Sequence, residues 1–205
     1  MSIALDIKGI LNETGYSLSI IRDKEISGEK GEFKSNSQIT KPFVRQHFLE
    51  GVLPYDTKII PGDVVKTVVN SEFFLAMNVT DVVLENTCIK KETVFYRCNV
   101  SGEVLRVSGE ERNLQTYALQ PIYQSISNLC YAVIADTDAG TDILQEERIG
   151  QIETNKLFLF IPHSVGIRPL DIYIPYSGEY YKVESVEKFR FPAVDYCILS
   201  ENTID

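Results

Sequence analysis

The two histidines limit the catalytic chemistry that this sequence could carry. A serine or cysteine nucleophile needs a nearby base, and His47 and His163 are the only imidazoles in the 205 residues. His47 lies in the stretch Phe43–Phe48, and His163 follows a proline at the end of an apolar run. Neither neighbourhood contains the G-x-S-x-G nucleophile elbow, and the chain has no glycine-rich phosphate-binding motif. We interpret both histidines as surface or interface side chains, and we assign no catalytic residue.

The four cysteines do not form a metal-binding pattern. Cys88, Cys98, Cys130 and Cys197 are separated by 10, 32 and 67 residues, which matches no zinc signature. Each cysteine has strand-like apolar neighbours, as expected for buried thiols in a reducing compartment. A disulfide between Cys88 and Cys98 across a hairpin is the alternative, and it would require an oxidising compartment. We assign no metal ligand and no cofactor.

One acidic segment has the spacing of a cation-binding loop. Counted from Asp136, carboxylates occupy positions 1, 3, 7 and 12 of a calcium-loop template, at Asp136, Asp138, Asp142 and Glu147. The glycine of the segment, Gly140, stands at position 5 instead of position 6, and strand-like residues precede it. We interpret the segment as an acidic hairpin tip, with a weak calcium site as the alternative.

The composition is that of a folded domain outside the membrane. Hydrophobic residues make up 44% of the chain and charged residues 24%, and the net charge is -9. An acidic balance argues against a protein that coats DNA or RNA, because such binding needs a basic face. No apolar run approaches the roughly 20 residues of a membrane-spanning helix. The first residues, MSIALDIKGILNETG, lack the basic start and continuous apolar stretch of a signal peptide.

Period-two patterns predict strands along most of the chain. A short helix is expected over residues 3–11, where Ile3, Ile7 and Ile10 are spaced for one helical face. The stretch Arg22–Lys34, with eight charges and two glycines in thirteen residues, is expected to be a mobile, solvated loop. The predicted strands are Gly15–Ile21, Val64–Val69, Phe73–Leu84, Thr93–Val107 (with a turn at Ser101-Gly102), Cys130–Ala135, Leu157–Ile161, Asp171–Ile174, Tyr180–Val186 and Val194–Leu199.

The middle of the chain has a different pattern. Apolar residues between Glu111 and Leu129 fall on one helical stripe, which includes Leu114, Tyr117 and Ile126. Pro121 interrupts this stripe, because proline has no amide to donate and clashes with the preceding turn. The sequence therefore predicts a kinked helical linker over residues 111–129.

Similar residues recur in the same order on both sides of this segment. The paired features are Pro61-Gly62-Asp63 with Pro169-Leu170-Asp171, Phe73-Phe74 with Tyr180-Tyr181, Tyr16 with Tyr131, and Cys98 with Cys197. The offset between the copies falls from 115 to 99 residues, as loop trimming in a duplicated domain would produce. Chance similarity of aromatic strands is the alternative.

The expected fold is therefore mainly β, with two small antiparallel β-barrel or sandwich domains joined by a short helical linker. The expected boundaries are residues 1–110 for the first copy, 111–129 for the linker and 130–205 for the second copy.

Three segments of the second copy carry a resemblance to a known family. Arg168–Ile174, Ser177–Val186 and Tyr196–Glu201 resemble the end of tailed-bacteriophage head–tail joining proteins, also called head-closure or stopper proteins. In that family an aspartate-bearing strand precedes a Gly-x-x-Tyr-x-Val-x-x-Val stretch and a last strand that ends on an acidic residue. Family members usually have a single copy, so the tandem arrangement of this chain is a departure.

The resemblance implies a non-enzymatic virion protein, made in the host cytoplasm and placed at the head–tail junction. It implies a homo-oligomeric ring that contacts a portal or adaptor protein and tail proteins and helps to retain packaged DNA. The DNA would pass nearby without sequence-specific binding, and an acidic ring would repel its phosphates. With two barrels in each chain, a sixfold ring would present pseudo-twelvefold symmetry.

Other functions remain open from the sequence. One alternative is a tail-terminator or tail-completion ring protein, and another is a β-sandwich module that binds a small ligand or a glycan. An enzyme is a third class, for which the sequence offers few catalytic signals. A ring assembly would favour the structural classes, and a ligand-filled pocket in a monomer would favour the binding module.

Overall fold

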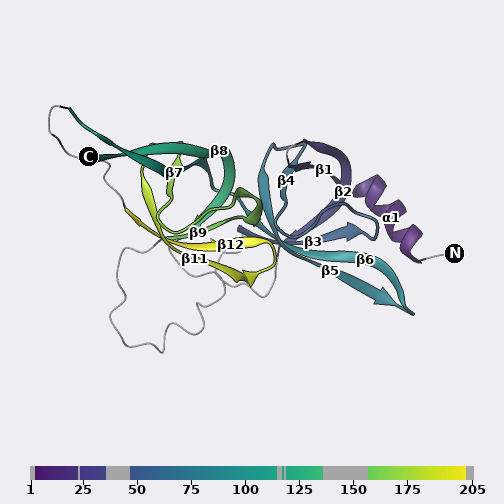
Figure 1. Ribbon diagram of the computed structural model, residues 1–205. Coiled ribbons are helices and arrows are strands. Elements are labelled where there is room, and N and C mark those ends of the chain that lie inside the picture. The colour runs from purple at the N-terminus through teal and green to yellow at the C-terminus, as the bar shows by residue number, and fades with distance from the viewer. Residues whose placement is uncertain are drawn as a thin grey trace, which may run out of the picture. The chain divides into compact units, whose positions relative to one another are not determined.

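The chain forms two barrels. The computed structural model describes residues 3–22, 24–35, 47–114, 117, 119–135 and 157–201. Contacts divide the chain into one compact unit of residues 1–98 with 191–194, and a second of residues 99–190 with 195–205. A closed antiparallel barrel of six strands forms in each half of the chain (Figure 1). The expected mainly β fold with two β domains is confirmed.

The first barrel follows a short helix. Its elements are α1 (Ile3–Thr14), β1 (Tyr16–Ile21), β2 (Ile26–Ser35), β3 (Phe48–Pro54), β4 (Val64–Thr67), β5 (Phe73–Leu84) and β6 (Thr87–Arg97). Around the barrel the strand order is β1-β2-β3-β6-β5-β4, closed by pairing of β4 with β1. The helix lies against β2, β3 and β6 and buries Ala4 and Leu11.

The second barrel repeats this path. Its elements are β7 (Val100–Arg112), β8 (Leu119–Ala135), β9 (Leu157–Pro162), a 3-10 turn (His163–Val165), β10 (Ile172–Pro175), β11 (Tyr181–Phe191) and β12 (Val194–Glu201). The strand order is β7-β8-β9-β12-β11-β10, closed by pairing of β10 with β7. β7 thus corresponds to β1, β8 to β2, β9 to β3, β10 to β4, β11 to β5 and β12 to β6.

Each barrel encloses its own apolar core. The first core is aromatic at its centre, where the Phe33 ring lies 5.1 Å from the ring of Phe95 and 5.2 Å from that of Phe74. The second core holds Tyr173 and Tyr181 among aliphatic side chains and two cysteines. Burial of alternate side chains along each strand drives the closure of both sheets.

The boundary between the two units differs from the expected one. The chain passes from the first unit to the second after Cys98, and the predicted strand Thr93–Val107 is two strands, β6 and β7, on either side of Cys98-Asn99. The turn expected at Ser101-Gly102 is wrong, because Gly102 lies inside β7. A Cβ atom at Gly102 would come within 2.3 Å of the Ile174 carbonyl oxygen, so close approach of β10 explains this glycine.

The predicted helical linker over 111–129 is also wrong. Most of the segment belongs to the β7–β8 hairpin, where Glu110 pairs with Pro121 and Val107 with Tyr123. The apolar stripe faces no core, since Leu114 is 85% exposed and Ile126 37% exposed. Pairing with β7 provides backbone hydrogen bonds along β8. A helix in this segment would need a core surface on which to pack its apolar face, because helices gain most of their stability from such packing.

The stretch Arg22–Lys34, expected to be a loop, contains most of β2. This strand pairs with β1 on one side and with β3 on the other. Ile26 and Phe33 both pack against the core although they are seven residues apart, because the pairing register with β1 shifts at Gly28. The strand was missed because it is densely charged and because this irregularity breaks the period-two pattern of its apolar residues.

The structure confirms some of the feature pairs of the expected internal repeat and contradicts another. The two Pro-x-Asp segments lie at the same place, directly before β4 and β10. Of the two aromatic doublets, Phe73-Phe74 begins β5, and Tyr180-Tyr181 spans the residue before β11 and its first residue. The pairing of Tyr16 with Tyr131 is wrong, because Tyr16 begins β1 and the equivalent strand is β7, whereas Tyr131 lies in β8.

Candidate functional site

The two Pro-x-Asp segments form the same turn. In each, an amide donates to the carbonyl oxygen three residues earlier: Asp63 to Ile60 at 3.2 Å, and Asp171 to Arg168 at 3.1 Å. Proline fixes the second position, and the third has a positive φ, +84° at Gly62 and +74° at Leu170. These features define a type II β-turn in both barrels.

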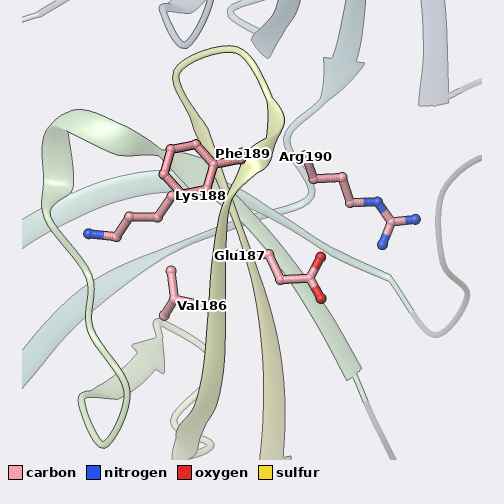
Figure 2. A pocket seen from close by; sticks show the side chains of 5 residues that line it. All are labelled: Val186, Glu187, Lys188, Phe189 and Arg190. Atoms are coloured by element: carbon pink, nitrogen blue, oxygen red, sulfur yellow. The ribbon is translucent and has the colours of Figure 1, made fainter.

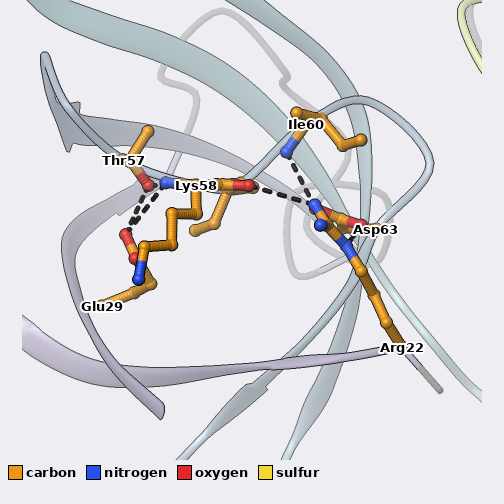
Figure 3. A network of polar contacts seen from close by, with 7 residues as sticks. Arg22, Glu29, Thr57, Lys58, Ile60 and Asp63 are labelled. Carbon is orange, nitrogen blue, oxygen red and sulfur yellow. Dashed lines mark hydrogen bonds and ion pairs between the residues drawn. The ribbon is translucent and has the colours of Figure 1, made fainter. Parts of the chain in front are cut away.

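In the first barrel the aspartate of this turn binds an arginine with both carboxylate oxygens (Figure 3). The Arg22 guanidinium donates from Nε to Oδ1 and from one terminal nitrogen to Oδ2 of Asp63, both at 2.7 Å. The same terminal nitrogen donates to the Lys58 carbonyl oxygen at 3.0 Å. The Ile60 amide donates to Asp63 Oδ2 at 2.8 Å. We call this arrangement the Arg–Asp clamp.

The second barrel contains the same clamp with the same spacing. Arg106 donates from Nε to Oδ1 of Asp171 at 2.8 Å and from its terminal nitrogen to Oδ2 at 2.7 Å. It also donates to the Gly166 carbonyl oxygen at 2.8 Å, and the Arg168 amide donates to Asp171 Oδ2 at 2.7 Å. The carbonyl and amide partners stand five and three residues before the aspartate, as in the first barrel.

The clamp holds a turn against the end of a strand. Arg22 follows β1 directly and Arg106 occupies the equivalent position in β7, since Ile21 pairs with Val64 and Leu105 with Ile172. Both aspartates are buried, and hydrogen bonding to them raises the pKa of both arginines. Because both oxygens of each carboxylate are occupied, the clamp stabilises the barrel rather than offering a reactive group.

Sequence reasoning found half of the clamp and missed the rest. The two Pro-x-Asp segments were recognised, but Arg22 was placed in a loop and Arg106 was not considered. The available signal was an arginine following an apolar strand, Leu18–Ile21 and Val104–Leu105, at the start of both copies.

A second carboxylate extends the network in the first barrel. Glu29 Oε2 accepts a hydrogen bond from the Thr57 hydroxyl at 2.7 Å and from the Lys58 amide at 3.3 Å (Figure 3). These contacts join β2 to the segment that leads into the turn, so one of the charged residues of β2 has a defined structural partner.

The histidines have different surroundings. His163 Nδ1 lies 2.7 Å from Oδ1 of Asp195, a carboxylate with no exposed surface, while the His163 side chain is 51% exposed. A buried carboxylate of this kind fixes the orientation of an imidazole ring. His47 is half-buried directly before β3. Among the described residues the His163 ring has Asp195 as its polar side-chain partner, so this pair presents a base without an adjacent nucleophile.

All four cysteines are reduced thiols. Cys130 and Cys197 are buried in the second barrel, and Cys88 and Cys98 are half-buried in the first unit. Burial raises the pKa of the Cys130 thiol to about 12 and also raises the pKa of the Cys197 thiol. Both groups therefore stay protonated near neutral pH, which makes them poor nucleophiles.

The acidic segment from Asp136 to Glu147 lies outside the described residues. Within the part of the chain that the structure describes, no cluster of three or more histidine, cysteine or carboxylate side chains could hold a metal ion.

A surface hollow follows β11. It has a volume of about 450 Å³ and is lined by five consecutive residues, Val186–Arg190 (Figure 2). Phe189 is completely exposed, and the Arg190 guanidinium lies 4.4 Å from the centre of the Tyr196 ring. The side chains of Lys188 and Arg190 point away from each other (Figure 2). A hollow along one strand does not enclose a ligand, since small-molecule sites bury most of their ligand's surface.

Comparison with protein-family models, with curated proteins and with solved structures finds no match to this chain. Across the described residues, no helix has the length and apolar character needed to cross a membrane. The features available for a functional argument are therefore the duplicated barrels and their surfaces.

Proposed function

We propose that this chain is a structural protein of a tailed-bacteriophage virion, which forms a ring at the head–tail junction. The observation that carries the proposal is the presence of the same closed barrel twice, each with the same Arg–Asp clamp. A ring of such chains contains twice as many barrels as chains. It could therefore match a neighbouring ring with as many subunits as it has chains, or a neighbouring ring with twice as many.

The family resemblance supports this assignment. Its three segments, Arg168–Ile174, Ser177–Val186 and Tyr196–Glu201, cover most of β10, β11 and β12. These strands are neighbours in the second barrel, in the order β10-β11-β12. The resemblance thus falls on one continuous part of a sheet.

The charge of the chain fits a channel that DNA crosses. With a net charge of -9, the protein repels the phosphate backbone, which favours passage of the duplex over binding. In this proposal DNA contacts are transient and independent of sequence, and the lasting partners are portal or adaptor proteins and tail proteins.

Electron microscopy of virions tests the proposal. An antibody against the purified chain should label particles at the junction of head and tail, and particles lacking the protein should lose packaged DNA or fail to join tails. Label on the capsid surface or at the far end of the tail, or no label in purified virions, would contradict the proposal.

A further inference from the structure

Equivalent strands of the two barrels have very different surfaces. β2 and β8 occupy the same place in the strand order. β2 carries four charged side chains in ten residues, Glu29, Lys30, Glu32 and Lys34. β8 carries none in seventeen residues, although charged residues make up 24% of the chain. The first barrel therefore serves as an internal reference, in which the strand at this position carries charged side chains.

β8 also extends beyond its barrel as part of a two-stranded hairpin (Figure 1). β10 pairs with β7 as far as Leu105, and β9 pairs with β8 over Val133–Ala135. Among the described residues, 106–112 of β7 therefore pair with 119–124 of β8 alone, beyond the barrel. Residues 125–132 of β8 pair with 100–105 of β7 inside the barrel, and no second partner strand adjoins them among the described residues. We call residues 106–114, 117 and 119–132 the β7–β8 arm, of which 106–112 and 119–124 form the part that extends beyond the barrel. A two-stranded hairpin is marginally stable by itself in water, so an arm of this length gains from packing against a surface.

The arm displays apolar side chains. Seven large apolar residues of the arm are exposed, by 37% to 85%: Val107, Leu114, Tyr117, Leu119, Ile122, Ile126 and Leu129. Single exposed apolar residues are ordinary on protein surfaces, whereas a group of them on one pair of strands indicates an interaction site.

The charge pattern of the arm indicates the kind of partner. A nucleic acid would need basic side chains and a basic protein would need acidic ones, and β8 has neither. Copies of this chain, each with a net charge of -9, repel each other unless they meet where like charges are absent. β8 is such a surface, and all charged residues of the two arm strands lie on β7.

We propose that the β7–β8 arm docks onto a second copy of this chain and forms the contact between neighbouring subunits. This inference deepens the proposed ring by naming its interface, and it rests on self-association of the chain. Burial of the seven apolar side chains provides the driving force, and the uncharged β8 keeps like charges apart.

Charge substitutions on the arm test this inference. The double variant Ile122→Lys/Ile126→Lys changes exposed side chains outside the core, so the barrel should remain folded. The matched control is Ile3→Lys/Ile10→Lys, which adds the same charge to α1, where both side chains are at least half exposed. The mass of each protein is measured by sedimentation equilibrium over a range of concentrations.

The expected result is assembly of the wild type and of the α1 control, with assembly of the arm variant weakened about 100-fold or more. Assembly of the arm variant at wild-type strength would overturn the arm inference and leave the proposed ring standing. A wild type that remains at 23.2 kDa at every concentration would overturn both. The two failures are therefore distinguishable.

Amide hydrogen exchange of the wild type provides a measurement that needs no variant. Exchange of residues 119–132 should slow on assembly, by comparison with the same protein diluted below its association range. Unchanged exchange in β8, together with slowed exchange elsewhere, would place the interface on another element and overturn the inference.

Discussion

The two barrels share their strand order, turn and clamp, and they differ in core composition and in surface charge. Both have the same strand order, the same type II turn and the same Arg–Asp clamp. They differ in the core, which is aromatic around Phe33 in the first barrel and largely aliphatic in the second. They also differ in the second strand, which is charged as β2 and uncharged as β8. The shared parts specify the fold, and the parts that differ are where separate roles can arise.

The largest expected effect comes from the aromatic core of the first barrel. Phe95 is completely buried and contacts Phe33 and Phe74, so Phe95→Ala should cost about 4 kcal/mol of unfolding free energy. Amide exchange measured by mass spectrometry should accelerate in β1–β6 and stay unchanged in β7–β12. Phe189→Ala is the matched control, since that ring is fully exposed and its loss should leave exchange unaltered.

Removal of the carboxylate charge from the clamps should have similar consequences in both barrels. Asp63→Asn and Asp171→Asn each leave a partly buried arginine without its counter-ion, and each should destabilise its own barrel by about 3 kcal/mol. Chemical denaturation followed by barrel-specific exchange measures the effect. The control Asp56→Asn removes an exposed ion pair with Lys8 and should cost less than about 1 kcal/mol. A strong effect in one barrel alone would show that the clamps are not equivalent.

Alkaline pH should destabilise the second barrel more than the first. The folded state raises the pKa of the Cys130 thiol from 9.0 to about 12, so the neutral thiol stabilises the second barrel. This contribution is complete below pH 9 and is lost between pH 9 and about 12, because the unfolded chain releases its proton first. At pH 10 the loss is about 1 kcal/mol for this thiol.

Two other groups act in the same direction. Burial raises the pKa of Cys197, and the hydrogen bond to Glu179 together with burial raises the pKa of Tyr181 to about 12. Exchange in β7–β12 should therefore accelerate as pH rises from 9 to 11, after correction for the intrinsic rate, and Cys130→Ala should reduce the pH dependence. Earlier opening of β1–β6 in alkali would contradict this account.

The smallest effect concerns the turn. Gly62 adopts its positive φ without strain, whereas Leu170 holds a similar φ with a side chain. Because Leu170 is 65% exposed, Leu170→Gly should remove backbone strain at little packing cost and stabilise the second barrel by about 0.5 kcal/mol. Thermal melting measures the shift, and a lower melting temperature would show that the Leu170 side chain contributes contacts that outweigh the strain.

Much of the fold could be predicted from local patterns. The strand Phe73–Leu84 was placed at its observed bounds, and the two Pro-x-Asp segments were matched correctly, because their residue types dictate local backbone geometry. The segment from Glu111 to Leu129 was predicted incorrectly because apolar residues spaced for a helix can also lie along a twisted, bulged strand. The deciding factor was pairing with β7, which no local pattern contains.

The clamp illustrates the same limit. Arg22 and Asp63 are 41 residues apart, and Arg106 and Asp171 are 65 residues apart, so their contact depends on barrel closure. The surface role that we propose for β8 could not be predicted either, because its lack of charge becomes informative only when β2 is known to occupy the equivalent position.

Counting chains and barrels in the assembled protein tests the central claim most directly. Native mass spectrometry gives the number of 23.2 kDa chains in the assembly, and averaged electron micrographs give the number of lobes around it. The account predicts a closed ring in which lobes outnumber chains by two to one. A single chain at all concentrations, or a ring with one lobe for each chain, would contradict it.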